Sequence, residues 1–417
     1  MQEQTKKLKL YFWGTGSGCE KALANFTGEA EIMGFIDNNP SQHGKSYHGK
    51  RVFGFQDIEA EFDYIVVTVK DYDSVTYQLE KNNVDLNKVL FYFDSSQKEE
   101  TIKPFFDIKG RKIDILEERL LNLEHLLEIN TCNLGYEIAD KIKKEKYQFP
   151  KLHSDEEAVE RIVNEHCSLI RFGDGEFEIM AGKERAPFQK CDKTLSEKLR
   201  EAITTDNDNI LIAIADNYGD LDIYTKHYAF GIREYMTEEV RAFHWSVLDP
   251  AKTYYNAYMF KCYLPYKDKS GTQKRINLIK RIWNQRDIVL VEGSQTRTGQ
   301  GNDLLNNAGS VKRILCPTKN AFTYYSEILN EVKKVSKDNM ILFALGPAGK
   351  VMAYDLISWG YQVIDIGQFD IDYEWFRAGK EMRVPVPTKY VAELPPAEVE
   401  EINDKKYAEE IIAYIHG

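Results

Sequence analysis

Strand-like and helix-like segments alternate along most of the second half of this chain. The strand-like apolar runs cover residues 168–172, 209–215, 287–292, 313–316, 340–345 and 362–366. Helix-like segments separate these runs, and parallel strands need crossovers of that kind to connect them. The alternation therefore predicts an α/β domain with a doubly wound, mostly parallel sheet and helices on both faces. Ligands of such sheets bind outside the carboxyl ends of the strands.

A shorter alternation comes first, with strand-like runs at residues 8–13, 32–36, 64–69 and 89–93. It predicts a small Rossmann-like α/β unit. Gly14, Gly16 and Gly18 approximate the dinucleotide fingerprint, but Cys19 stands where its third glycine belongs. Asp37 follows the next strand, where a ribose-binding acid would lie. The unit is similar to Rossmann-type modules of bacterial polysaccharide enzymes, which implies a nucleotide-related ligand; a scaffold is the alternative.

One amphipathic helix is predicted between these units. Its apolar residues recur at alternating spacings of three and four, at Ile113, Leu116, Leu120, Leu123 and Leu127. The pattern is short for a coiled coil and breaks at Asn130, which favours packing against one of the chain's own domains. A homodimer formed through this helix stays open.

The length of 417 residues predicts more than one domain. We assign residues 1–100 to the Rossmann-like nucleotide-binding-type domain, residues 101–150 to a helical linker and residues 151–417 to the larger α/β domain. Prolines interrupt regular structure from residue 385 onward, and a polar helix is predicted at residues 397–415.

Composition excludes several classes of partner. The net charge of -11 argues against nucleic acid and against an anionic membrane surface, although a local basic pocket remains compatible with it. No apolar stretch reaches the length of a transmembrane span, and the first residues lack the apolar core of a signal peptide. Six scattered cysteines are typical of reduced thiols, so we expect a cytoplasmic protein.

The segment at residues 171–178 sets two carboxylates, Asp174 and Glu176, on either side of Gly175, directly after a strand. A hard divalent cation prefers carboxylate oxygens and leaves positions open for phosphate. Arg171 and Gly173 stand beside the pair and would contact a diphosphate. The alternative is a strand-to-helix turn whose acids cap a helix that begins near Phe177.

A second motif follows the strand at residues 287–292. Arg297 precedes Gly299 and Gly301, and Asn302 and Asp303 come next. If a helix begins here, free backbone N–H groups and its dipole could bind a pyrophosphate beside the arginine. The alternative is an Asn or Asp cap on an ordinary helix.

Gly346 and Lys350 lie in a loop that superficially resembles an ATP-binding P-loop. Ala344 replaces the first P-loop glycine and Val351 replaces the magnesium-binding Ser or Thr, so we reject ATP hydrolysis. Two interpretations remain: a loop that contacts a nucleotide, and a close approach of strand and helix through glycine.

Two candidates compete for the catalytic base. Glu292 ends a strand beside Arg297, and Asp370 belongs to an acidic cluster that also contains Asp365, Asp372 and Glu374. A base must reach the acceptor hydroxyl within hydrogen-bond distance, which sequence cannot decide. Tyrosines and lysines between residues 252 and 267 could form an acceptor groove, but core packing is favoured. His244 stays outside the catalytic set.

Taken as an ordered series, the segments at residues 171–178, 291–304, 345–356 and 364–375 resemble the GT-D glycosyltransferases. The resemblance implies a metal-dependent sugar transfer, with Asp174 and Glu176 at Mn²⁺ or Mg²⁺ and the diphosphate. It also implies a UDP-sugar donor, glucose or a related hexose, and inversion at the sugar. A glycan on a surface protein or polysaccharide is the implied acceptor. The alternative is a noncatalytic nucleotide-sugar-binding or scaffolding subunit of a glycosylation complex.

Overall fold

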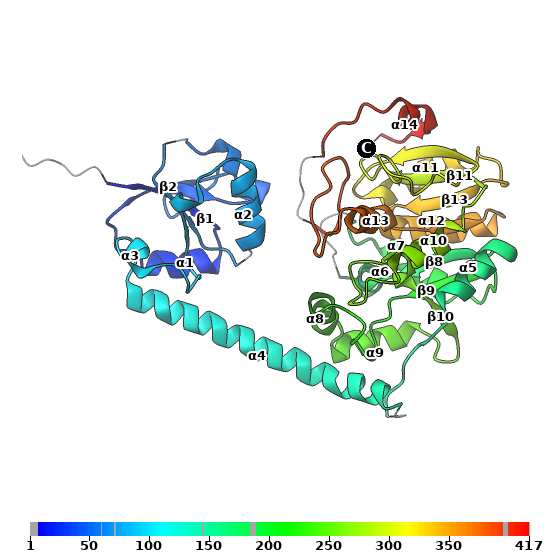
Figure 1. The fold of residues 1–417 in the computed structure, drawn as a ribbon, viewed down its shortest axis with the longest axis horizontal. Coiled ribbons are helices and arrows are strands. Elements are labelled where there is room, and N and C mark those ends of the chain that lie inside the picture. The colour runs from blue at the N-terminus through cyan, green and yellow to red at the C-terminus, as the bar shows by residue number, and fades with distance from the viewer. Residues whose placement is uncertain are drawn as a thin grey trace, which may run out of the picture. The chain divides into compact units, whose positions relative to one another are not determined.

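The computed structural model describes residues 7–59, 61–70, 72–143, 146–183, 189–394 and 399–416. The chain divides into two compact units, Met1–Glu128 and Ile129–Gly417. The division falls inside one long helix, α4 (Ile108–Lys141), which the sequence pattern predicts only as far as Asn130 (Figure 1). Asn130 does not end the helix, because a polar side chain at an exposed position disturbs no buried contact and costs only its modest helix propensity.

The first unit contains a six-stranded sheet in the order β3-β4-β2-β1-β5-β6. The strands are β1 (Lys9–Trp13), β2 (Glu31–Ile36), β3 (Ser46–Tyr47), β4 (Lys50–Phe53), β5 (Tyr64–Val67) and β6 (Val89–Phe91). All pairs are parallel except β3 with β4. The helices of this unit before α4 are α1 (Ser17–Ala24), α2 (Tyr72–Lys81) and α3 (Glu99–Ile102). This is the Rossmann-like arrangement predicted for the unit.

The glycine turn of this unit packs closely against other residues of the same unit. A side chain at Gly18 would lie 2.2 Å from the carbonyl oxygen of Thr68, so this glycine permits close packing against the loop after β5. The carboxylate of Asp37 accepts a hydrogen bond from the hydroxyl of Thr15 across the turn. Both candidate nucleotide features therefore have partners within the unit.

The second unit contains a nine-stranded sheet in which every strand pair is parallel, in the order β15-β12-β11-β13-β14-β8-β9-β10-β7. The strands are β7 (Lys151–Leu152), β8 (Ser168–Phe172), β9 (Ile210–Ile214), β10 (Thr253–Asn256), β11 (Asp287–Gly293), β12 (Ser310–Cys316), β13 (Met340–Ala344), β14 (Val363–Asp365) and β15 (Ile411–Tyr414).

Helices cover both faces of this sheet (Figure 1). One face packs against α7 (Lys193–Ile203), α11 (Tyr325–Val332) and α12 (Gly346–Ser358). The other packs against α5 (Asp155–Asn164), α10 (Thr272–Lys280) and α13 (Phe369–Arg377). The remaining helices are α6 (Asp174–Met180), α8 (Lys226–Tyr235), α9 (Glu238–Val247) and α14 (Lys405–Glu410). Alternating strand residues supply two separate apolar cores, as a sheet buried on both sides requires.

Three predicted helices differ from the structure. Residues 294–309 form successive turns instead of a helix, because Arg297, Gly299 and Gly301 all adopt positive φ. Helix α6 begins at Asp174 rather than near Phe177. Of the predicted helix at 397–415, residues 397–398 lie outside the described part of the chain.

The described remainder of that last segment forms a short helix, α14, and then strand β15. Strand β15 pairs in parallel with β12, and the isoleucines and the tyrosine among residues 411–414 favour a strand over the predicted helix. Within the described ranges, no helix combines the length and apolar character that crossing a membrane requires.

Candidate functional site

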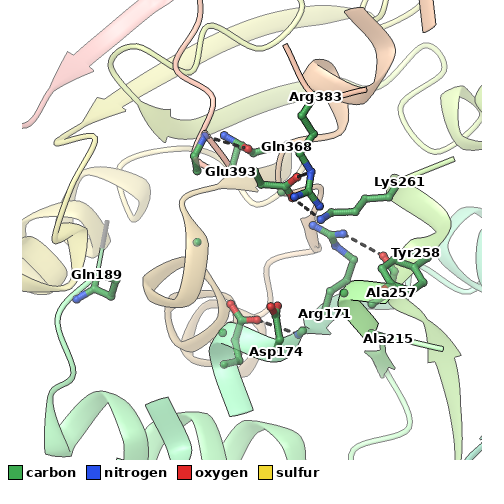
Figure 2. Close-up of a pocket in the computed structure, with 18 of the residues that line it drawn as sticks. Arg171, Asp174, Gln189, Ala215, Ala257, Tyr258, Lys261, Gln368, Arg383 and Glu393 are labelled. Carbon is green, nitrogen blue, oxygen red and sulfur yellow. Dashed lines mark hydrogen bonds and ion pairs between the residues drawn. The ribbon is translucent and has the colours of Figure 1, made fainter. Parts of the chain in front are cut away.

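A cavity of about 610 Å³ opens at the carboxyl ends of the strands in the second unit. Residues after β8, β9, β10, β11, β13 and β14 contribute to its wall, including Asp174, Asn217, Tyr258, Thr296, Gly346 and Gly367. Figure 2 shows Asp174 and Tyr258 among the residues that line it. This is the edge at which parallel α/β sheets bind their ligands. The cavity is large enough for a nucleotide-sized molecule.

Asp174 and Glu176 occupy the first turn of α6, and both line the cavity. Their surroundings differ. Oε2 of Glu176 accepts a hydrogen bond of 2.9 Å from the backbone N–H of Gly173, and Oε1 lies 3.4 Å from Nζ of Lys350. Asp174 is exposed to the cavity, while Glu176 is buried. Glu176 therefore caps the helix, as the alternative interpretation of this motif expects, and Asp174 is the more accessible carboxylate.

Arg171 is oriented by contacts on two neighbouring segments. Its Nε donates to the carbonyl oxygen of Asp365 at 2.8 Å, and its Nη1 donates to that of Ala257 at 3.1 Å. Its guanidinium lies 5.1 Å from the ring centre of Phe260. A side chain at Gly367, which has φ of +51°, would come within 2.0 Å of Nη2 of Arg171. Gly367 is therefore required where the arginine passes.

Lys350 and Asp365 form a charged pair at the base of the cavity. Nζ of Lys350 lies 3.1 Å from Oδ2 of Asp365 and also faces Glu176. Burial alone would raise the pKa of Asp365, but the charges of Lys350 and then Arg171 hold that pKa below its usual value. Lys350 thus connects two acids. The structure is compatible with both interpretations of the glycine loop, because Lys350 faces the cavity and Gly349 lets α12 approach Phe343 on β13.

The sequence pattern missed another charged group on the cavity wall. Lys261, Arg383 and Glu393 all line the cavity, and Glu393 pairs with both cations (Figure 2). Arg383 and Glu393 come from the irregular segment after α13, so no strand or helix periodicity identifies them. The only available signal was the basic and aromatic segment at 252–267, which contributes Tyr258 and Lys261 to the cavity and Tyr254 and Phe260 to the core.

His244 packs against α6 and supports it. Its ring stacks on Phe177 with 3.7 Å between centres, and its nitrogens lie 2.7 Å and 3.0 Å from the hydroxyls of Tyr218 and Tyr235. Burial lowers the pKa of His244 to about 3. The ring is therefore neutral near pH 7 and holds the helix that carries Asp174.

The structure places Glu292 away from the cavity. Its side chain is fully buried, Arg313 donates to it at 2.6 Å, and the backbone N–H of Thr298 donates at 2.8 Å. Arg313 also donates to Glu410 at 2.7 Å. A carboxylate that is enclosed and paired in this way cannot reach an acceptor hydroxyl, so its position favours a structural role.

Asp370 is also separated from the cavity. It accepts hydrogen bonds from the backbone N–H of Gly299 at 2.9 Å, from Nδ2 of Asn302 at 2.7 Å and from Nζ of Lys389 at 2.5 Å. Arg297 donates to the carbonyl oxygens of Thr388 and Glu400. These bonds fasten the loop after β11 to neighbouring segments.

The predicted site residues thus form two groups. The first lines the 610 Å³ cavity and contains Arg171, Gly173, Asp174, Glu176, Gly346 and Lys350. The second does not, and contains Glu292, Arg297, Gly299, Gly301, Asn302, Asp303 and Asp370. Four of the second group, Gly299, Gly301, Asn302 and Asp303, line a smaller hollow of about 380 Å³. Because no helix follows Gly301, the predicted dipole contribution is absent there.

The acids of the cavity limit how a metal could be bound. Among the described residues, no group of three or more His, Cys, Asp or Glu side chains is placed to hold an ion. The accessible carboxylate of Asp174 still fits a magnesium-like ion, which commonly takes one or two protein carboxylates and fills its other positions with phosphate and water.

Comparisons with known proteins agree with this geometry. A family model described as the glycosyltransferase GT-D fold matches residues 169–394, which include every residue of the first group. A second model, described as C2185-like, N-terminal, matches residues 6–90.

Two curated proteins of streptococci are similar to this chain. "Glycosyltransferase GlyD" of Streptococcus pneumoniae is 32% identical over 262 residues, which are 62% of this chain and 32% of that protein. "Probable glycosyl transferase Gly" of Streptococcus gordonii is 31% identical over 270 residues, 62% of this chain and 38% of that protein. The chain thus spans about a third of the length of these relatives.

Solved structures match the same region. A domain of unknown function described as having a distinct glycosyltransferase fold has a TM-score of 0.61 at 33% identity, over 64% of this chain and 96% of its own. A glycosyltransferase from Streptococcus sanguinis has a TM-score of 0.61 at 29% identity, over 64% of this chain and all of its own. Since the family model covers more than half of the chain, the protein belongs to the glycosyltransferase GT-D fold family.

Proposed function

We propose that this protein transfers a sugar from a nucleoside diphosphate sugar to a glycan acceptor. The observation that carries this proposal is the exposed carboxylate of Asp174 in a 610 Å³ cavity that also contains Arg171 and Lys350. Family membership and the names of the streptococcal relatives support the same activity. An acid beside fixed cations suits a donor whose leaving group is a metal-bound diphosphate.

UDP is the proposed carrier, and Mn²⁺ or Mg²⁺ the proposed metal. Asp174 would hold the ion directly, while Glu176, occupied by Gly173 and Lys350, would set the position of the helix turn. When bound, the ion would neutralise negative charge that develops on the departing diphosphate. Arg171 is held rigidly by two carbonyl oxygens, so it can contribute positive charge to the same diphosphate without first losing conformational freedom.

The identity of the sugar and the stereochemistry belong to the proposal as well. A hexose such as glucose and transfer with inversion follow from the resemblance described for the sequence. Tyr228 and Tyr258 line the cavity and offer ring faces of the kind on which sugars stack. The base would be a cavity residue within reach of the acceptor hydroxyl, which removes Glu292 and Asp370 from first consideration.

Nucleotide release from a panel of sugar nucleotides, with and without Mn²⁺, tests this proposal. We expect one UDP-sugar to release UDP in a metal-dependent manner, and to raise the melting temperature as its concentration increases. Sugar nucleotides that bind without ever yielding nucleotide, with or without glycan acceptors, would instead support a binding subunit. Failure of every donor to bind would contradict both.

A further inference from the structure

Two cations share one carboxylate on the cavity wall that faces Asp174. Glu393 pairs through Oε1 with Nζ of Lys261, and its Oε2 lies 2.8 Å from Nε of Arg383 (Figure 2). We call these three residues the Glu393 cluster. Among these three side chains, two positive charges face one negative charge. Two cations placed side by side in this way are typical of an anion-binding site, in which Glu393 occupies the place of an external anion.

The cluster is accessible to solutes in the cavity. Its side chains are 35%, 32% and 25% exposed for Lys261, Arg383 and Glu393. A pair in such a position gains little stability from its Coulomb energy, because solvent screens it. A second anion can reach both cations, which fully buried pairs such as Glu292 with Arg313 do not permit.

Other contacts fasten the segment that carries Glu393. Lys389 pairs with Asp370 and Glu374, and the backbone N–H of Tyr390 donates to the carbonyl oxygen of Gln295 at 2.8 Å. Gln368 bonds to the backbone of Tyr390 and Ala392, one residue before Glu393. The segment is thus held in place without the ion pairs of Glu393.

We propose that Lys261 and Arg383 bind the diphosphate of the donor and that Glu393 is an internal counter-ion that phosphate oxygens displace. This inference rests on the proposed function. An arginine fork and a lysine ammonium are the side chains best suited to phosphate oxygens. Arg383 also lies over the ring of Tyr228, 5.0 Å from its centre, which limits the directions that the guanidinium can take.

The substitution Glu393→Gln separates this proposal from a purely structural ion pair. If Glu393 competes with phosphate, its neutral variant binds inorganic pyrophosphate and UDP about fivefold more tightly, and Lys261→Met binds both about tenfold more weakly. If the cluster only fastens the segment, Glu393→Gln lowers the melting temperature and does not tighten anion binding.

Isothermal titration calorimetry with pyrophosphate and with UDP, on the full chain, measures both effects. Glu137→Gln is the matched control, because Glu137 forms a comparable, partly exposed pair with Arg233 away from the cavity. Unchanged or weaker binding by Glu393→Gln, or equal tightening by Glu137→Gln, would overturn the proposal. The same titrations distinguish failure of the anion site from failure of the proposed function. If Glu393→Gln binds pyrophosphate more tightly and Lys261→Met more weakly, but no UDP-sugar is turned over, the proposed function is contradicted and the anion site is retained.

A separate observation concerns helix α4 in the first unit. Its residues Asp114, Ile115 and Arg111 are buried against that unit. On the other side, the apolar stripe of α4 is exposed, at Ile113, Leu116, Leu120, Leu123 and Leu127, with exposed fractions between 56% and 68%. An exposed apolar stripe of this length on a globular protein usually marks an interface.

The stripe follows a heptad repeat. With Ile113, Leu120 and Leu127 at position a, Leu116 and Leu123 occupy position d. Flanking charges then fall at e and g: Lys112 and Arg119 at g, Glu117 and Glu124 at e. In a parallel pair of helices, each g residue meets the e residue five positions later on the partner helix. Both contacts, Lys112 with Glu117 and Arg119 with Glu124, join opposite charges.

An antiparallel pair would instead bring g residues together and e residues together, so that like charges meet. Within its own unit, Lys112 pairs with Glu99 and Glu117 with Lys21, both on the exposed surface. Such exposed pairs are weak and exchange readily. The e and g charges are therefore complementary between two copies of this helix in the parallel orientation and not in the antiparallel one.

We infer that α4 pairs with α4 of a second copy of this chain as a parallel two-stranded coiled coil over residues 112–127. Sedimentation velocity of the full chain is expected to show a dimer. Leu120→Glu should raise the dimer dissociation constant by about tenfold or more. Leu121→Glu is the matched control: the neighbouring residue is equally exposed, 56% against 57%, but lies at position b.

Charge variants test the orientation. Arg119→Glu should weaken the dimer, and Arg119→Glu with Glu124→Arg should restore it, because the exchanged charges again pair between copies. Circular dichroism of each variant shows whether the helix itself is intact. A monomeric wild type, equal disruption by Leu120→Glu and Leu121→Glu, or strengthening by Arg119→Glu would overturn the inference.

Discussion

Two strands of the same parallel sheet carry similar residues at their carboxyl ends and use them differently. After β8, Asp174 lies open to the cavity, near Arg171 and Lys350. Near the end of β11, Glu292 is enclosed with Arg313 and with the backbone N–H of Thr298. Both acids lie at the carboxyl ends of apolar strands, and both are close to an arginine in sequence or space. The difference is that Glu292 is sealed from solvent, whereas Asp174 is exposed to the cavity.

This contrast separates charges that build the fold from charges that are available to a ligand. A buried carboxylate with a partner for each oxygen is costly to disturb and inaccessible to substrate. An exposed carboxylate in a cavity is less costly to disturb and is accessible to substrate. Substitutions on the two sides should therefore divide into effects on activity and effects on stability.

The largest expected effect is on activity, at Asp174. Asp174→Asn keeps the size of the side chain and removes its charge, so we expect the rate of UDP release to fall by about 100-fold or more while the melting temperature stays close to that of the wild type. Glu178→Gln on the same helix, outside the cavity lining, is the control and should retain activity. A fully active Asp174→Asn would remove the basis of the comparison.

The next effect is on stability, at Glu292. Glu292→Gln leaves Arg313 buried with one acid instead of two, and we expect the free energy of unfolding of the larger unit to fall by about 3 kcal/mol. Urea denaturation measures this change, and activity per folded molecule should be little affected. Loss of activity with unchanged stability would make Glu292 the catalytic base after all.

A substitution at Gly367 tests whether the position of Arg171 controls donor binding, because it changes no charge. The added methyl group of Gly367→Ala would displace Arg171, so we expect the KM for the donor to rise by about tenfold. Gly379→Ala is the control for backbone strain, because Gly379 also has a positive φ, +60°, but nothing lies within 4 Å of the added atom. Equal changes in both variants would mean that strain, rather than the position of Arg171, controls donor binding.

The last effect appears only at acidic pH and involves His244, which supports α6. Its pKa is lowered to about 3 in the folded protein, so below the ordinary value of 6.5 only the unfolded chain takes up this proton. Stability is therefore lost as pH falls from 6.5 towards 3, by about 1.4 kcal/mol per pH unit. Urea denaturation of wild type and His244→Gln across this range should give converging curves, and parallel curves would contradict the assignment.

The sequence predicts the long buried strands, misses β3, β4, β7, β10 and β15, and predicts the side-chain partners poorly. The apolar run at β13 is uninterrupted, that at β8 is interrupted only by Arg171, and a glycine follows each within two residues, so pattern alone places them and the residues that follow them. For that reason the amino-acid sequence suffices to place Arg171, Asp174, Gly346 and Lys350 at one edge of the sheet.

The rest depends on contacts between distant segments. Arg313 reaches Glu292 because β11 and β12 are neighbours in the sheet, and Lys389 reaches Asp370 from an irregular segment. Neither pairing has a local sequence signal. The pattern at residues 294–309 wrongly predicts a helix, because Asn and Asp near glycine suit helix caps and tight turns equally well.

Strand β15 has a consequence for the behaviour of the protein in solution. It pairs with β12 at the margin of the nine-stranded sheet, and Glu410 just before it holds Arg313. Deleting residues 405–414 would bare the backbone donors and acceptors of β12, which run beside an apolar core. An unpaired edge strand of this kind can pair with strands of other molecules, so the shortened protein should form insoluble aggregates.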